Sequence, residues 1–155
     1  MNVIENVNND LSQRVVVNTQ TMEWQPSPSQ TVWRKPLYRE GGEYGPVTSI
    51  VRYDAGGKFR THQHPQGEEI LVLDGEFCDE HGRYPKGSYL LNPDGSQHSP
   101  YSDSGCTIFV RLRQYEGNDR PQVRINAQKN PWLQGMVEGL TVLPLYSQAD
   151  HPESM

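Results

Sequence analysis

One stretch of the chain, residues 56–75, constrains the fold more than any other because it sets possible metal ligands beside core-forming residues. It reads GGKFRTHQHPQGEEILVLDG, with His62 and His64 two positions apart. Side chains at i and i+2 of a strand point to the same face, so both imidazoles reach one point in space. Buried polar groups of this kind are costly unless something compensates for their desolvation. The stretch therefore predicts strands forming a rigid wall, with its polar residues meeting around a metal ion inside.

The rest of the sequence favours an all-β domain. The 155 residues suggest one domain, and 14 Gly and 12 Pro indicate many turns. Short apolar runs alternate with Gly, Pro and Asp turns, and no amphipathic helix is evident. This pattern is typical of a β-sandwich or barrel. The expected strands cover residues 14–19, 46–53, 58–64, 69–75, 76–84 (a hairpin), 87–95 (a strand running into a tight turn) and 105–115.

Charge and cysteine content narrow the choice of partners. The formal net charge is −5, which argues against nucleic acid, since phosphate binding needs a basic face. No apolar run approaches the length that spans a membrane, and the first residues lack the features of a secretory signal. Cys78 and Cys106 make no disulfide framework and are interpreted as small buried hydrophobes. A cytoplasmic protein is expected.

Two further residues complete a predicted metal site. Glu68 follows His64 by four positions, across a corner at residues 65–67, and His98 follows a Pro-Asp-Gly turn. Glu69 competes with Glu68, but alternation along a strand points Glu69 to the other face. The metal ligands are therefore predicted to be His62, His64, Glu68 and His98. The two remaining histidines, His81 in a hairpin turn and His151 in the C-terminal tail, are expected to be solvated.

The spacing of these residues resembles the two motifs of the cupin superfamily. Gly56, His62-x-His64, Glu68 and Gly75 match the first motif, and Gly87, Pro93-x-Gly95 and His98 match the second. Ser102 stands where the second motif ends in Asn, which is not a ligand in the family. The resemblance implies a double-stranded β-helix, or jelly-roll, barrel. More narrowly, residues 47–115 resemble the cupin domain of ChrR-type anti-sigma factors and their stand-alone relatives.

That narrower resemblance implies zinc as the metal, with Fe(II) second because several single-domain cupins are iron-dependent dioxygenases. Two functions stay open: a metal-bearing binding or sensing module, and a dioxygenase of the acetylacetone-cleaving or dicarbonyl type. The anti-sigma factors grip their sigma factor through a separate N-terminal helical domain with a His/Cys zinc site. Here no Cys precedes Cys78 and no His precedes His62, so no sigma factor is expected as a partner.

Three residues are candidates for a ligand pocket beside the metal. Arg60 shares strand parity with His62 and is a candidate to meet a small anionic ligand at the barrel mouth, with a solvated arginine on the rim as the favoured alternative. Tyr89 and Tyr101 are the aromatic candidates, with core packing as the alternative for both.

The two ends of the chain resemble each other. Residues 14–38 and 122–146 align without a gap at an offset of 108, with seven of 25 positions identical, including Trp24/Trp132 and Tyr38/Tyr146. The predicted organisation is a disordered tail at 1–13, a single cupin domain at 14–121 with its metal-binding core at 47–115, a partial repeat at 122–146 that packs on the barrel, and a tail at 147–155. A half-repeat leaves strand edges that need a partner, which favours a homodimer.

Overall fold

The computed structural model describes residues 5–115, 117 and 119–149, and His151 lies outside these ranges. The described residues form strands, turns and bends and contain no helix, as the sequence predicted for an all-β domain. No helix long and apolar enough to span a membrane occurs among them. The strands are Gln25–Pro26 (β1), Val32–Arg39 (β2), Val47–Tyr53 (β3), Gly57–Lys58 (β4), His62–His64 (β5), Glu68–Asp79 (β6), Gly82–Pro85 (β7), Ser88–Asn92 (β8), Ser96–His98 (β9), Tyr101–Ser102 (β10), Cys106–Leu112 (β11), Val123–Asn126 (β12), Leu133–Gln134 (β13) and Thr141–Val142 (β14).

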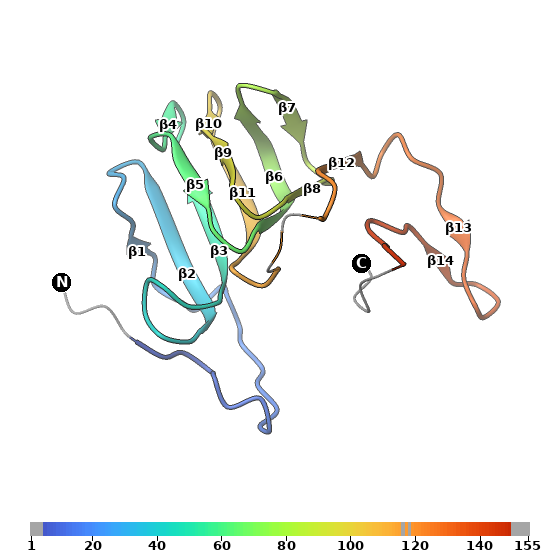
Figure 1. Cartoon of the computed structure of the whole chain (residues 1–155), viewed down its shortest axis with the longest axis horizontal. Helices are drawn as coiled ribbons and strands as arrows, with labels where there is room; N and C mark the ends of the chain where they lie inside the picture. The colour runs from blue at the N-terminus through green and yellow to red at the C-terminus, as the bar shows by residue number, and fades with distance from the viewer. Residues whose placement is uncertain (1–4, 116, 118, 150–155) are drawn as a thin grey trace.

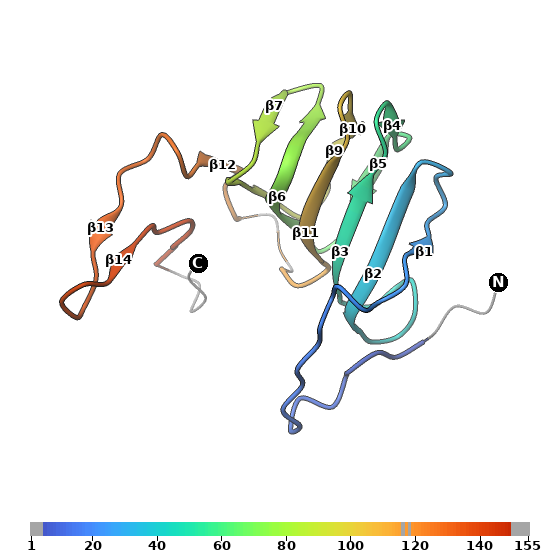
Figure 2. The ribbon, with the colours of Figure 1, turned by 180° about the vertical axis from the view of Figure 1, so that it is seen from behind.

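The strands build a curled antiparallel sheet that forms a half-open barrel (Figures 1 and 2). The order β1-β2-β3-β11-β6 forms its main wall, β8 continues it beyond β6, and β12 pairs with β8. The far half of the long strand β6 pairs with β7 and β10, and β10 pairs with β4. The short pair β5–β9 forms a separate two-stranded sheet that carries all three predicted histidine ligands. This is the jelly-roll arrangement predicted from the sequence.

The barrel interior is an apolar core that fixes the strands around the site. Along β6 and β11 alternate side chains point inward, so Ile70 and Val72 pack with Ile108 and Val110 and with Phe77. Burying one such side chain stabilises the fold by about 1.5–3 kcal/mol. This packing holds the barrel wall in place beside the polar residues of β5, β6 and β9.

The outer face of the same wall is covered by the C-terminal region. Tyr89 and Leu91 of β8 pack there with Tyr115 and Tyr146. Glu69, which strand alternation predicts on this face, accepts a 2.6 Å hydrogen bond from the Tyr89 hydroxyl. Successive side chains at the start of β6 therefore point to opposite faces of the sheet, and Glu69 points to the outer face.

The expected strand at residues 14–19 is wrong. These residues form no strand, and Val15, Val16 and Val17 are exposed. A run of β-branched residues fits a pleated surface, but a strand also needs a neighbouring edge to pair with. No partner strand for residues 14–19 exists in the part of the chain that the structure describes.

The two repeat-like segments share local structure. The Gln20 backbone amide donates to Asn18 Oδ1 over 3.0 Å, and at an offset of 108 the Gln128 amide donates to Asn126 Oδ1 over 2.9 Å. The second segment then continues into the β13–β14 hairpin, which stands apart from the barrel strands in both views (Figures 1 and 2). That residues 122–146 stay packed on the barrel, in the same chain or a partner, remains a prediction.

Candidate metal centre

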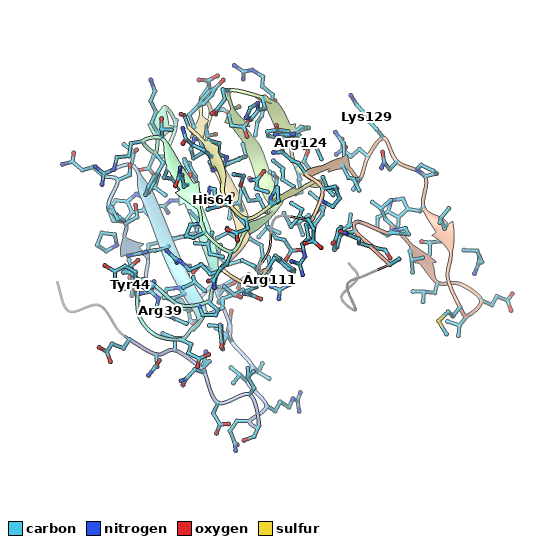
Figure 3. All side chains as sticks on the ribbon, in the orientation of Figure 1. Arg39, Tyr44, His64, Arg111, Arg124 and Lys129 are labelled. Atoms are coloured by element: carbon cyan, nitrogen blue, oxygen red, sulfur yellow. The ribbon has the colours of Figure 1, made fainter. Side chains whose placement is uncertain are left out.

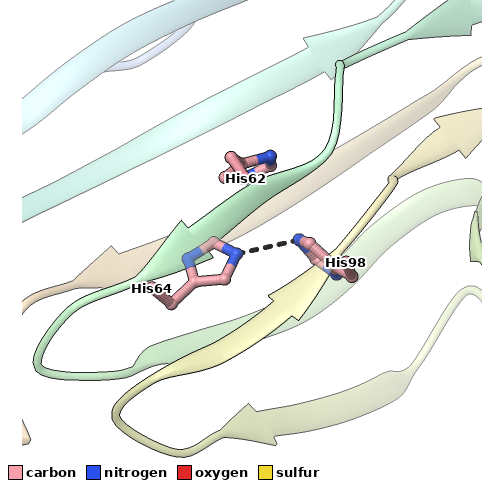
Figure 4. Close-up of side chains that lie close together, drawn as sticks. All are labelled: His62, His64 and His98. Carbon is pink, nitrogen blue, oxygen red and sulfur yellow. Dashed lines mark hydrogen bonds between the residues drawn. The ribbon is translucent and has the colours of Figure 1, made fainter.

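Three histidines meet on the small β5–β9 sheet (Figure 4). The antiparallel register places His62 opposite His98, so their side chains share a face, and His64 shares it by alternation. One ring nitrogen from each of the three lies within 4.8 Å of the other two. The closest pair is His64 Nε2 and His98 Nε2, 2.9 Å apart. The tight β5–β9 pairing thus gathers residues that are up to 36 positions apart in the sequence.

The predicted carboxylate lies beside this cluster. Glu68 begins β6 and is buried, with Oε2 3.4 Å from His64 Nε2 and 3.6 Å from His98 Nε2. The Asn92 side-chain amide donates a 2.9 Å hydrogen bond to the same oxygen. Glu68 therefore contacts two of the three predicted histidine ligands, whereas the set of ligand atoms that all lie within 4.8 Å of one another comes from the histidines alone.

Burial sets the protonation of the cluster. It lowers the pKa of His64 to about 3, with His98 and Arg113 adding to the effect, and it also lowers the pKa of His62. Burial opposes protonation of His98 too, but Asp79 and Glu68 outweigh it and raise the pKa of that ring. At neutral pH His62 and His64 are neutral imidazoles, which is the form that binds a metal ion.

The donor set fits a divalent metal. It offers three imidazole nitrogens and one carboxylate oxygen, which are accepted ligands of zinc and of several first-row transition metals. Two Nε2 atoms face each other at 2.9 Å, so the pair has room for only one proton between them. Without a metal, one ring donates this proton to the other; a metal ion bound by both rings would take the place of the proton.

Asp79 lies on the side of His98 that faces away from the other histidines, and it was not predicted from the sequence as part of the site. Its Oδ2 lies 3.5 Å from His98 Nδ1, the ring nitrogen turned away from the cluster. Its Oδ1 accepts hydrogen bonds from the His81 and Gly82 amides and from the Tyr84 hydroxyl. At 3.5 Å the two atoms make a charge contact and not a normal hydrogen bond, and neither has another partner among the described residues. A carboxylate in this position favours the proton on His98 Nδ1 and so leaves Nε2 free for a metal. The only sequence signal was the turn after Asp79, which predicts a turn residue and not a partner for His98.

A cavity of about 210 Å³ adjoins the histidines. His62, His64 and Glu68 form part of its wall. Most of the remaining wall is apolar, and a group of charged residues closes part of it. The apolar residues include Val32, Val51, Tyr53, Phe59, Ile108, Val110 and Leu112, and the charged ones are Arg34, Glu43 and Arg113. Such a cavity suits a small molecule with an apolar body and polar groups.

The structure does not place the three predicted pocket residues in this cavity. Arg60 precedes β5, so strand parity does not apply to it; its side chain is exposed, and its carbonyl oxygen lies 2.8 Å from His62 Nδ1. Tyr89 points to the outer face, where it packs with Tyr115. Tyr101 lies on β10, opposite Cys78, and is not part of the cavity wall. The arginines that do line the cavity, Arg34 and Arg113, were not singled out from the sequence.

An antiparallel jelly-roll barrel that holds an His-x-His pair, a Glu and a third His together on its inner wall defines a cupin. A sequence model of the ChrR Cupin-like domain matches residues 12–116. The chain belongs to this family. No curated protein matches the chain at a significant level.

Solved structures with the same fold share little sequence with this chain. A chain of the Rhodobacter sphaeroides complex of SigE with the anti-sigma ChrR is 20% identical, with a TM-score of 0.52, over 61% of this chain and only about half (51%) of its own length. A protein from Methylibium petroleiphilum, proposed to be an acetylacetone dioxygenase, is 17% identical with a TM-score of 0.59 over 77% and 85% of the two chains. An RmlC-like cupin from Shewanella frigidimarina is 13% identical with a TM-score of 0.55 over 70% and 93%. These similarities show the fold.

Proposed function

We propose that this cupin is a binding or sensing module that takes up a small anionic molecule at a metal centre. His62, His64, Glu68 and His98 would hold the metal. The observation that carries the proposal is the cluster of three histidines, with Glu68 beside two of them, at a cavity of about 210 Å³ whose wall includes His62, His64 and Glu68. When bound, a divalent metal polarises a ligand oxygen as a Lewis acid.

The chain's own residues prepare this site. Asn92 orients the Glu68 carboxylate, and Asp79 holds His98 with its Nε2 toward the cluster. The apolar wall, including Val51 and Phe59, keeps water away from the ligand and strengthens polar contacts within the cavity. Zinc is the first choice for the metal, supported by the family and by a set of four ligands that suits it, and Fe(II) is the second.

The second candidate function is an Fe(II)-dependent dioxygenase that cleaves acetylacetone-like dicarbonyl compounds. Two observations favour it. The fold matches that of the Methylibium petroleiphilum protein, and the cavity wall beside the histidines is mostly apolar. In this case the same four ligands would hold iron.

Metal analysis separates the two candidates. Protein purified without added metal is expected to contain one zinc per chain and to consume no oxygen; stoichiometric iron with substrate-dependent oxygen uptake would decide for the dioxygenase. The cobalt-substituted protein should change its visible spectrum with some members of a panel of organic acids and β-dicarbonyls. His64→Ala should abolish both metal and spectrum, whereas His81→Ala, in a turn of the β6–β7 hairpin, should change neither. Full metal content in the His64→Ala variant would refute the proposed centre.

The setting of the protein is also proposed. The chain would be a cytoplasmic homodimer with no nucleic-acid or membrane partner, supported by its net charge of −5 and by the exposed apolar side chains of the C-terminal arm. Trp132, for example, is 57% exposed. Light scattering at micromolar concentration tests the dimer, and a monomeric mass would contradict it.

A further inference from the structure

A second polar group adjoins the cavity and consists of three arginines around one glutamate. Arg34 donates two hydrogen bonds to the Glu43 carboxylate, of 3.0 and 3.4 Å. Arg39 NH1 lies 3.5 Å from the same carboxylate. Arg113 lines the cavity with Arg34 and Glu43. Burial opposes ionisation of Glu43, but Arg34, Arg39 and Arg113 together lower its pKa.

A β-bulge aims Arg39 into the barrel. Val47 and Val51 of β3 line the cavity, and their partners on β2 are Arg39 and Arg34. An extra residue, Leu37, interrupts the register between them. If β2 had no bulge, Leu37 would pair with Thr48, and Tyr38 would stand opposite Val47 in place of the arginine. Bulges often re-aim a side chain next to a functional site.

Arg113 also has an unusual backbone. Its φ is +58°, a left-handed conformation that residues with side chains rarely adopt. Its amide donates to the Gly67 carbonyl, which fixes the chain just beyond β11. Strain of this kind persists where the surrounding structure enforces it, and it is frequent at ligand-binding sites.

The charges of this group do not balance. Three guanidinium groups face one carboxylate, which leaves an excess of two positive charges. Arg39 is only 4% exposed, and its Nε has no hydrogen-bond partner among the described residues. Burial lowers the pKa of Arg39, and Arg34 and Arg113 add to this effect while Glu43 opposes it. A buried cation without full compensation is costly, and an incoming anion would relieve that cost.

We infer that Arg34 and Arg113, which line the cavity, form its anion subsite together with Arg39, which is buried against Glu43, and that Glu43 is a tethered stand-in for the carboxylate of the ligand. The inference deepens the proposed function, on which it rests for the metal end of the ligand. The ligand class is a dicarboxylate or oxo-acid: one end carries oxygens for the metal, and the other carries a carboxylate for the arginine fork.

The position of Glu43 suits a group that a ligand displaces. Its side chain is 42% exposed, and it sits in the loop between β2 and β3. Gly41 and Gly42 precede it, both with φ near +70°, and Gly45 follows. Tyr44 at the tip of this loop is exposed, and Figure 3 shows it beside Arg39 at the end of β2, away from His64 inside the barrel. A loop with three glycines can carry Glu43 outward while the arginines stay in place.

The test is isothermal titration of the full chain with malonate, succinate and glutarate, both zinc-loaded and stripped with a chelator; succinamide is the neutral control probe. At least one diacid should bind, and succinamide should not. Arg113→Gln should weaken diacid binding by about tenfold or more, because a charge-assisted hydrogen bond is lost. Glu43→Gln should strengthen it by about two- to fivefold, because the competing ion pair is removed. Arg83→Gln, at an exposed ion pair with Glu76, is the matched control and should change nothing.

The outcomes are distinct. Absence of diacid binding to the wild-type chain, unchanged affinity in a folded Arg113→Gln variant, or weaker binding in Glu43→Gln would overturn the subsite; the last result would mean that the four charged residues only brace the loop. Arg113→Lys, which keeps the charge but not the fork, guards against a folding defect and should lie between wild type and Arg113→Gln. Diacid binding that depends on Arg113 in the stripped protein, without any zinc stoichiometry in the loaded one, would support the subsite and refute the metal centre.

Discussion

Replacing Asp79 with Asn should weaken metal binding, because it changes which ring nitrogen of His98 carries the proton. The carboxylate has two distinct oxygens: Oδ1 accepts hydrogen bonds from the His81 amide (2.8 Å), the Gly82 amide (3.1 Å) and the Tyr84 hydroxyl (3.1 Å), and Oδ2 faces His98 Nδ1 at 3.5 Å. In Asp79→Asn the three donors hold the amide oxygen at the Oδ1 position. The NH₂ group must then face His98 Nδ1.

The loss of metal affinity in Asp79→Asn can be estimated from the change in the His98 tautomer. With a donor opposite, His98 Nδ1 becomes an acceptor, and the ring proton moves to Nε2, the nitrogen that faces His64. Metal binding must then displace that proton or rotate the ring. Loss of such an outer partner typically weakens metal affinity about 10- to 100-fold, or about 1.4–2.7 kcal/mol. The fold should survive because the three hydrogen bonds to the amide oxygen remain.

Competition with a chromophoric zinc chelator measures the effect, and circular dichroism monitors the fold. Asp74→Asn is the matched control, since Asp74 carries the same charge but is 78% exposed and lies in a surface pair with Lys86. It should bind zinc as the wild type does. Equal zinc affinity in a folded Asp79→Asn variant would refute the argument that Asp79 fixes the tautomer of His98.

Three further predictions concern the ligands, the arm and the strand geometry. His64→Ala, and a His62→Ala, His98→Ala double variant, should lose stoichiometric metal, and the metal-free wild type should unfold at a lower temperature because the ligands tie separate strands together; metal analysis and calorimetry check both. Limited proteolysis should not quickly remove everything after Tyr115, because β12 pairs with β8 and Tyr146 is buried, and a stable core ending at Tyr115 would contradict this. Gly75→Ala should sharply lower the midpoint of thermal unfolding, since Gly75 has φ +72° and an added Cβ would lie 2.2 Å from the Gly105 carbonyl oxygen. An unchanged midpoint would show that the strands can shift there.

The ligand cluster could be predicted from the sequence because local rules generate it. Alternation along a strand fixes the faces of His62 and His64, and a short corner delivers Glu68. The second motif returns His98 to the same sheet, opposite His62. The steps within each motif span a few residues, so spacing carries that part of the information, whereas the return of His98 follows from the resemblance to the second cupin motif.

The arginine group and the orienting aspartate could not be predicted in the same way. Arg39 stands opposite Val47 because of a bulge in β2, and Arg113 lies just beyond β11 with a left-handed backbone that strand alternation does not describe. Asp79 reaches His98 across the barrel interior from the far end of β6. Parity with His62 does not extend to Arg60, because Arg60 lies outside β5, and its side chain is exposed. Faces are readable from sequence only while strand register is regular.

The two segments related by the offset of 108 show where local coding ends. Gln25 stands opposite Arg34 in the β1–β2 hairpin, and Leu133 opposite Val142 in β13–β14, which is the same register 108 positions on. The aromatic anchors nevertheless differ. The Trp24 ring is covered by Lys35 and by Arg52 of β3, at 4.4 and 4.6 Å, whereas Trp132 is 57% exposed. β2 has β3 beside it, and β14 has no second neighbour in the described part of the chain. The turn sequence therefore sets the register of each hairpin, but the tryptophan before it is covered only where a second strand lies alongside. A partner strand packed on the surface around Trp132 would stabilise that hairpin by covering the exposed ring.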